Sequence, residues 1–317
     1  MPLLSNLTIR VLVAVVAIPL ILLLVLAGGF LFSAFVAALS TLALRELYLL
    51  SRAKGAMPQM ATGLGFGLLL NAVFVFDRIR FSVAGLLDRF GQSVATPSMP
   101  QFLLIVMLSL VPVTLAIELF RGKPGPLINT ATTVFGAVSV ALMFGSLIGI
   151  RELFVPGDFP VYAHFSVPGP SVPEDVIVTI DRWGAYTVIA VFASIWLCDS
   201  AAYFTGRAVG RHKLFERVSP NKTWEGALAG FAAAVVAFLV ARWLLLPYLT
   251  FTQALVCGVI VGVFGQIGDL AESLLKRDAG VKDSSSLIPG HGGLLDRFDS
   301  LLFVSPLFYC YLDFIVF

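Results

Sequence analysis

The sequence predicts an all-α protein, a polytopic bundle of about nine transmembrane helices. Of its 317 residues, 58% are hydrophobic and only 13% are charged, whereas a typical soluble domain has roughly 25% charged residues. The apolar residues gather in runs of about 20, the length of a helix that crosses a bilayer. Each run is predicted to be helical, because an isolated strand in hydrocarbon would leave its backbone polar groups unpaired.

The predicted spans follow one another closely, and the first two form a tight helical hairpin at Gly28 and Gly29. The first span is predicted to be retained rather than cleaved as a signal peptide, because further apolar runs follow it instead of a polar domain. The predicted spans are residues 11–27, 30–50, 61–76, 101–120, 130–150, 183–204, 226–246, 251–268 and 299–317.

Lys and Arg residues orient the chain, since cytoplasmic loops are enriched in them. They recur after the second, fourth, sixth and eighth spans, so these four links and the N-terminus are predicted to be cytoplasmic and the C-terminus to lie outside. Acidic residues prevail on the other side, in the link 151–181. The segment 77–100 is placed outside despite three arginines, and its piece Ile79–Phe90 fits an amphipathic helix on the membrane surface.

Ionisable residues are sparse in residues 1–180, which are predicted to form about five spans with a scaffolding or oligomerisation role. Glu118 and Arg121 are predicted to pair across one turn near a helix end, as an interfacial feature. Polar groups become dense after this point, so residues 181–317 are predicted to be the catalytic domain. The chain lacks the internal repeat that marks many transporters.

Two cytoplasmic motif loops, at 205–225 and 269–298, carry the candidate chemistry, so the active site is predicted to face the cytoplasm. The second loop begins on a helix whose polar residues recur at i, i+3, i+4 and i+7 and so share one face. They are Asp269, Glu272, Ser273 and Lys276. Ionisable groups at membrane depth are costly and mark function.

A glycine-rich segment follows in the same loop. Gly290, Gly292 and Gly293 surround His291 and allow either a close approach of backbone N–H groups to a phosphate or a tight turn. His291 has no second His or Cys at metal-ligand spacing, so it is predicted to bond a phosphate or hydroxyl, with a structural loop histidine as the alternative. Asp296 then begins the last helix, and hard carboxylate oxygens beside phosphates suit Mg²⁺.

The earlier loop contains an acidic residue, Asp199, near the end of a long apolar helix. Ser219 and Pro220, with Thr223, are predicted to begin the seventh helix, whose free N–H groups and Lys222 would form an anion site. The GxxxxGK[ST] spacing of a P-loop is absent. The alternative is that this basic loop is only a topology signal that contacts lipid headgroups.

These two loops resemble those of the phosphatidate cytidylyltransferase (CDP-diacylglycerol synthase) family. The longer matching run is Ser273-x-Leu275-Lys276-Arg277-x4-Lys282-Asp283-x-Ser285-x2-Ile288-Pro289-x-His291-Gly292-Gly293-Leu294-x-Asp296-Arg297-Phe298-Asp299. The run Ser219-Pro220-x-Lys222-Thr223-x-Glu225-Gly226 is similar to the family's other loop. The resemblance covers residues 195–300, and the first 180 residues resemble the family only as a set of apolar helices.

The resemblance implies a nucleotidyltransferase of phospholipid biosynthesis that converts CTP and phosphatidic acid to CDP-diacylglycerol and pyrophosphate with Mg²⁺. The lipid phosphate is already an anion, so metal ions and a cationic clamp would serve to offset charge repulsion and align an in-line attack at the α-phosphorus. The partners implied are CTP, phosphatidic acid and membrane lipid, without nucleic acid, and a homodimer is compatible with this interpretation. The implied location is the bacterial inner (plasma) membrane.

The resemblance also assigns roles to residues. The expected metal ligands are Asp269 and Asp296, followed by Asp199 and Asp283. The cations expected to hold phosphates are Lys222, Lys276, Arg277, Lys282 and Arg297, with hydrogen bonds from Ser219 and His291. The CTP-binding residues expected are Ser219, Lys222, Thr223, Gly292 and Gly293.

Two alternatives remain open at this point. Within the same class, a polyprenol kinase or a CDP-archaeol-type synthase would share many features; the Lys-Asp…His-Gly-Gly…Asp-Arg-x-Asp series argues against the kinase but does not fix the lipid tail. In a different class, a membrane transporter would also place charges in apolar helices. Against it, the charges cluster at one membrane face rather than along a pathway.

Overall fold

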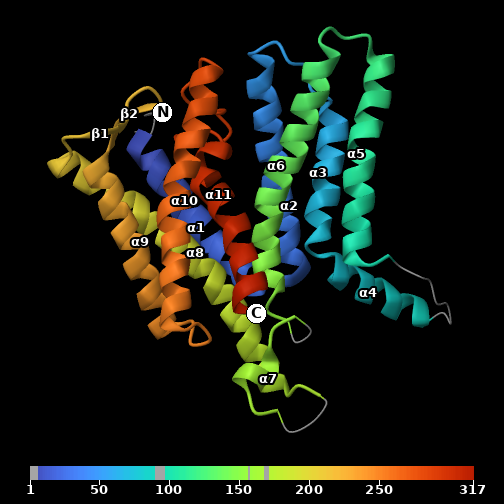
Figure 1. Cartoon of the computed structure of the whole chain (residues 1–317), viewed down its shortest axis with the longest axis vertical. Helices are drawn as coiled ribbons and strands as arrows, with labels where there is room; N and C mark the ends of the chain where they lie inside the picture. The colour runs from blue at the N-terminus through green and yellow to red at the C-terminus, as the bar shows by residue number, and fades with distance from the viewer. Residues whose placement is uncertain (1–5, 90–96, 156–157, 168–170) are drawn as a thin grey trace. The chain divides into compact units, whose positions relative to one another are not determined.

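The computed structural model describes residues 6–89, 97–155, 158–167 and 171–317 (Figure 1). It confirms the all-α polytopic bundle, and each of the nine predicted segments is helical over most of its length. In the described part of the chain, seven helices are long and apolar enough to cross a membrane, or eight if one bent pair counts as a span. The apolar part of the first helix, Val11–Ala27, is shorter than these.

The chain forms two compact units, one of residues Phe30–Gly149 and one that joins Met1–Gly29 to Ile150–Phe317. We refer to the first as the inserted unit and to the second as the motif unit. The boundary predicted near residue 180 concerns catalytic and scaffolding roles, and that division stays a prediction. By packing alone, however, the first helix and the segment from Ile150 belong with the motif loops.

The inserted unit consists of five helices, three of which meet at a core of Leu70, Val106 and Ala141. Its helices are α2 (Gly29–Arg52), α3 (Met60–Val73), α4 (Phe76–Asp88), α5 (Met99–Arg121) and α6 (Pro126–Glu152). The third span ends earlier than expected, since the chain bends by 79° between α3 and α4. Helix α4 confirms the helix predicted at Ile79–Phe90, although Phe90 lies outside the described residues.

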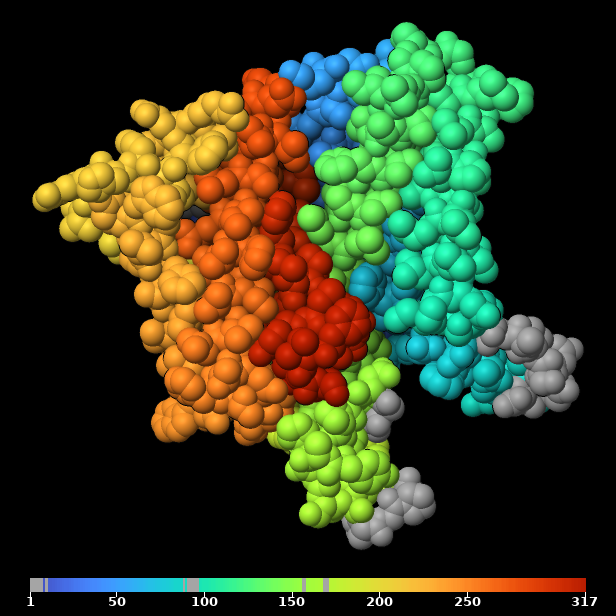
Figure 2. Space-filling model, viewed as in Figure 1, coloured from blue at the N-terminus to red at the C-terminus, as the bar shows by residue number. Residues whose placement is uncertain are grey.

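The motif unit is built around four long antiparallel helices and a β-hairpin (Figure 1). Its elements are α1 (Asn6–Ala27), α7 (Val161–His164), α8 (Glu174–Val209), β1 (Lys213–Phe215), β2 (Ser219–Thr223), α9 (Trp224–Leu244), α10 (Phe251–Asp278), α11 (Leu295–Tyr311) and a final π-helical turn (Leu312–Val316). Side chains of α9, α10 and α11 form one continuous surface in Figure 2.

Small residues let these helices pack closely, as is common between membrane helices. A Cβ atom on Gly230 of α9 would lie 2.8 Å from the Cys198 carbonyl oxygen of α8. A Cβ on Gly262 of α10 would lie 2.9 Å from the Phe231 ring of α9. Backbones therefore approach one another at these glycines, and the polar residues next to them are brought together.

The start of the seventh span differs from the prediction. Residues Ser219–Thr223 form strand β2, which pairs antiparallel with β1, and the helix begins only at Trp224. Thr223 is the N-cap, and its hydroxyl oxygen accepts a hydrogen bond from the Gly226 N–H at 3.2 Å. The pairing with β1 supplies backbone partners to this stretch, and β-branched Thr223 favours the extended conformation of an N-cap.

Candidate active site

The two motif loops meet at one end of the motif unit, where α8 and α10 finish and α9 and α11 begin (Figure 1). Lys222 of strand β2 forms an ion pair with Asp269 of α10. Both side chains are about one-third exposed, so the pair is accessible to solvent. The structure thus connects the loops 205–225 and 269–298 by a direct contact between two of the predicted site residues.

Two further carboxylates interact with Asp269 of this ion pair, so that three helices each contribute one carboxylate. Asp299 of α11 experiences the negative charge of both Asp269 and Asp199, and Asp199 of α8 also experiences that of Asp269. Gly268 explains the approach of α10 to α11, since a Cβ atom there would lie 2.5 Å from the backbone oxygen of Asp299. Like charges repel, so a cation bound near these carboxylates would stabilise them.

Asp296, one turn before Asp299, has a different set of neighbours. Its Oδ2 accepts hydrogen bonds from the Gly293 N–H at 2.7 Å, the Ser284 N–H at 2.9 Å and the Ser284 hydroxyl at 3.0 Å. Its Oδ1 accepts one from Lys276 Nζ at 2.6 Å. The side chain is only 3% exposed. Asp296 therefore fixes the 279–294 loop to the helices on both sides of it.

Lys276 is held between two carboxylates. It forms ion pairs with Glu272 on its own helix and with Asp296, and its side chain is 11% exposed. The predicted polar stripe is thereby confirmed, with Ser273 Oγ also 3.5 Å from Asp269 Oδ1. The ammonium group faces protein carboxylates rather than open solvent.

The 279–294 loop and the start of α11 surround a pocket of about 570 Å³. Among the predicted site residues, its lining includes Lys282, Asp283, His291, Gly292 and Arg297. The size is in the range of pockets that hold small ligands. Two of the side chains, Lys282 and Arg297, supply positive charge, so the pocket suits an anionic ligand.

Comparison with known proteins places this chain in a family. A family model described as the cytidylyltransferase family matches residues 8–315. The chain belongs to this family. The match confirms that the chain is a nucleotidyltransferase, as the motif resemblance implies.

Three curated proteins similar to this chain are phosphatidate cytidylyltransferases. The one from Synechocystis sp. is 33% identical over 314 residues, which is 95% of this chain and 94% of that protein. The one from Bacillus subtilis is 45% identical over 136 residues, 42% of this chain and 49% of that protein. The one from Brucella suis is 47% identical over 132 residues, 41% of this chain and 48% of that protein.

Within this cytidylyltransferase fold, some predicted ligand-binding groups are engaged in holding the protein itself together. The Thr223 hydroxyl caps α9, and the Gly293 N–H bonds Asp296. Gly292 has a φ of +85° and allows close packing, since a Cβ there would lie 2.8 Å from Asp296 Oδ2. Exposed Arg277 donates to the Val281 carbonyl oxygen at 3.2 Å. The predicted roles of these residues in binding CTP or phosphate stay predictions.

Asp299 ends the motif run that resembles the family, but no ligand role was predicted for it. In the described residues, no three His, Cys, Asp or Glu side chains form a ready-made metal site. The negative charges of Asp199, Asp269 and Asp299 nevertheless repel one another, while Lys222 pairs with Asp269 and the positive charge of Lys276 acts on Asp299. The spacing of Asp296 and Asp299 could have indicated two carboxylates near the site, but not which of them faces Asp269.

Gly268 offers a test of the helix contact that gathers these carboxylates. Replacing it with valine is expected to separate α10 from α11 at Asp299 and to lower the turnover rate by about 10²-fold, because small misplacements of reacting groups cost about this much. The measurement is turnover by purified protein. Gly65→Val is the control for added bulk on a helical glycine, because a Cβ on Gly65 of α3 meets nothing within 4 Å. Equal losses of turnover in both variants would contradict a specific role of the Gly268 contact.

Proposed function

We propose that this chain transfers the cytidylyl group of CTP to phosphatidate and forms CDP-diacylglycerol and pyrophosphate. The observation that carries the proposal is a family match over nearly the whole chain, together with a relative of that activity aligned over 95% of it. The site agrees with this chemistry, because it combines a cationic pocket and a carboxylate cluster at one end of apolar helices. Both a soluble nucleotide and a lipid headgroup can reach such a position.

In the proposed reaction, a phosphate oxygen of the lipid attacks the α-phosphorus of CTP, and the bond between that phosphorus and the bridging oxygen to the β-phosphorus breaks. Pyrophosphate leaves with that bridging oxygen. The nucleophile is already an anion, so the chain need not remove a proton from it. Lys282 and Arg297 in the pocket would hold the triphosphate, and His291 would donate a hydrogen bond to it.

The proposed Mg²⁺ would be held by carboxylates of Asp269, Asp299 and Asp199. The fit rests on the donor set, since these are hard oxygen ligands that repel one another, although Lys222 pairs with Asp269 and the positive charge of Lys276 acts on Asp299. When bound, the ion would neutralise phosphate charge and polarise the phosphorus. Asp283 and Asp296 were also predicted as ligands. Asp283 lines the pocket of about 570 Å³, which we call the nucleotide pocket because it would hold CTP. Asp296 has its oxygens occupied by the loop and by Lys276.

Lys276 and Asp296 are proposed as positioning residues. Asp296 orders the loop that carries Lys282 and His291, and Lys276 neutralises Asp296 within a nearly buried site. Lys222, by pairing with Asp269, would keep the carboxylate cluster oriented and would hold a phosphate when the lipid arrives. Ser219 lies on the same strand and would add a hydroxyl contact.

The reaction itself gives the first test. Purified protein in detergent is expected to release pyrophosphate from CTP only when phosphatidate and Mg²⁺ are both present. Phosphorylation of a polyprenol by CTP would instead identify the kinase alternative, and faster turnover of an ether-linked isoprenoid phosphatidate would identify the archaeol-type synthase. Absence of pyrophosphate release with every lipid would contradict the proposal.

The cytoplasmic location of the site, in the bacterial inner membrane, gives a second test. Single cysteines at positions 215 and 285, in a variant without the native cysteines, are expected to resist a membrane-impermeant thiol reagent in intact cells and to react after permeabilisation. The basic residues of both loops motivate this orientation. Phe215 is exposed, and Ser285 lines the nucleotide pocket. Labelling of either position in intact cells would reverse the proposed orientation.

A further inference from the structure

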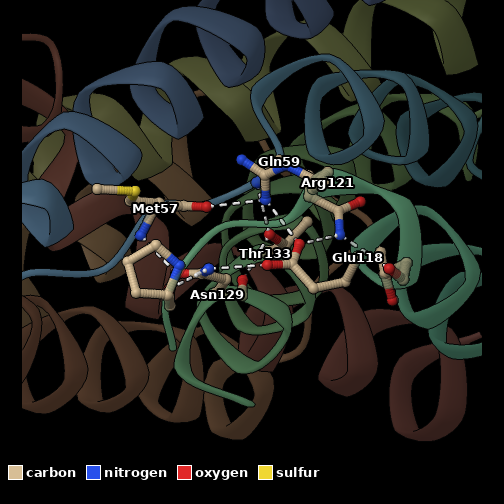
Figure 3. Close-up of polar contacts among 8 residues, drawn as sticks. Met57, Gln59, Glu118, Arg121, Asn129 and Thr133 are labelled. Carbon is tan, nitrogen blue, oxygen red and sulfur yellow. Dashed lines mark hydrogen bonds and ion pairs between the residues drawn. The ribbon is translucent and has the colours of Figure 1, made fainter. Parts of the chain in front are cut away.

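The inserted unit contains a buried polar network that the proposed reaction does not use. Glu118 is at its centre, with a side chain 3% exposed (Figure 3). One carboxylate oxygen accepts a hydrogen bond from Gln59 Nε2 at 2.8 Å, and the other accepts one from Asn129 Nδ2 at 2.8 Å. The Gln59 backbone N–H in turn donates to Thr133 Oγ1 at 2.8 Å. These hydrogen bonds hold the members of the network in one geometry, although Gln59 Oε1 has no hydrogen-bond partner among the described residues.

The network fixes the link between α2 and α3 against α5 and α6. The Met57 N–H donates to Asn129 Oδ1 at 2.6 Å, and the Met57 carbonyl oxygen accepts a hydrogen bond from Arg121 Nη1 at 3.0 Å. The same nitrogen of Arg121 pairs with Glu118 at 2.6 Å. Among the described residues, Nη2 and Nε of Arg121 have no hydrogen-bond partner. The guanidinium is therefore held in place through Nη1, and its other nitrogens can still donate hydrogen bonds to a ligand.

A pocket of about 330 Å³ opens beside this guanidinium. Its lining contains three cationic side chains, Arg52, Arg121 and Lys123, and a stretch of backbone from Gly55 to Pro58. Arg52 and Lys123 are exposed, and in the described part of the chain neither pairs with a carboxylate. None of the described residues that line the pocket is acidic. The pocket thus presents concentrated positive charge. Arg121 is held by hydrogen bonds, whereas Arg52 and Lys123 are exposed side chains that can adjust to a ligand.

The surroundings of the pocket are apolar and exposed. Phe120, next to Arg121, is 86% exposed, and Leu127, shortly after Lys123, is 84% exposed. Helices α5 and α6, which carry these residues, are both long and apolar enough to cross a membrane. Such helices bury their apolar side chains in lipid and place their terminal Lys and Arg at headgroup level. The pocket consequently lies where a lipid phosphate, rather than a freely dissolved ion, is at high concentration.

We propose that this pocket binds the phosphate headgroup of an anionic membrane lipid, as a second lipid site outside the reaction centre. Guanidinium and ammonium donors converge on phosphate oxygens in such sites, and basic pockets between membrane helices recognise anionic headgroups. The excess of cations selects a net negative headgroup over a zwitterionic one. The bound lipid would join the ends of α2, α5 and α6 to the membrane surface.

The test measures lipid binding, so its outcome is separate from that of the proposed reaction. Purified full-length protein, stripped of lipid in neutral detergent, is titrated with phosphatidylglycerol or phosphatidylcholine, and bound lipid is counted by native mass spectrometry. Wild type is expected to bind one more phosphatidylglycerol than Arg52→Gln/Lys123→Gln, whose apparent Kd at this site rises at least about tenfold. This double substitution leaves Glu118 bonded to Arg121, so the buried network is kept.

The matched control is Arg78→Gln/Arg80→Gln, which removes two positive charges from α4 of the same unit outside the pocket lining. It is expected to change the Kd less than about twofold. Equal phosphatidylglycerol binding by wild type and Arg52→Gln/Lys123→Gln would overturn the proposal. Equal binding of phosphatidylcholine would also overturn it. Displacement of the lipid by millimolar inorganic phosphate would assign the pocket to free phosphate instead.

Discussion

Replacing Asp299 with asparagine is expected to lower the turnover of CTP and phosphatidate by about 10²–10³-fold, the cost of removing a preorganised charged group from a reaction centre. The side chain is nearly isosteric, and Asp299 sits where the charges of Asp199 and Asp269 converge. Removing its charge would weaken the hold on Mg²⁺. The Mg²⁺ concentration for half-maximal rate should therefore rise, and Asp269→Asn should behave alike because it occupies the same cluster.

Asp278→Asn is the matched control for Asp299→Asn, because Asp278 is an exposed carboxylate at the end of α10 outside the cluster. Its turnover and Mg²⁺ dependence should stay within about twofold of wild type, as expected for a surface substitution. Asp296→Asn distinguishes the ordering of the 279–294 loop from the binding of Mg²⁺. If Asp296 orders the loop, its loss should raise the KM for CTP more than the Mg²⁺ requirement. An Asp299→Asn protein with normal Mg²⁺ dependence would remove Asp299 from the metal site.

The helices and the polar stripe were predictable from the sequence because both follow from local periodicity. Apolar runs of about 20 residues identify spans, and the i, i+4 spacing alone puts Glu272 and Lys276 in contact. The ion pair of Glu118 with Arg121 was predicted on the same ground and is confirmed. Its surroundings were not, since Gln59, Asn129 and Thr133 come from distant positions in the chain.

Tertiary contacts determine the features that could not be predicted from the sequence. The start of α9 was misplaced because Pro220 and Thr223 fit a helix start, while the pairing of β2 with β1 is visible only in the fold. The choice between Asp296 and Asp299 depends on the contact of Gly268 with α11. A glycine in an apolar helix signals close packing, but the sequence does not name its partner.

Lys276→Ala is expected to lower the free energy of unfolding by about 3–5 kcal/mol, the usual cost of removing one partner from a buried ion pair. The loss would leave Glu272 and Asp296, which are 8% and 3% exposed, without their shared cation. This outcome differs from that of a phosphate-holding lysine, whose loss would lower turnover and leave stability unchanged. Unfolding in detergent, followed by heating or by a denaturing surfactant, measures the difference.

Arg277→Ala is the matched control for Lys276→Ala, since Arg277 is the next residue on the same helix and is exposed. Among the described residues, the one hydrogen bond of its side chain is to the Val281 carbonyl oxygen, so stability should change by no more than about 0.5 kcal/mol. Adding Glu272→Gln to Lys276→Ala should restore part of the lost stability, because it removes one of the two unpaired charges. If Lys276→Ala unfolds like wild type but turns over slowly, Lys276 holds a substrate phosphate and the positioning role is wrong.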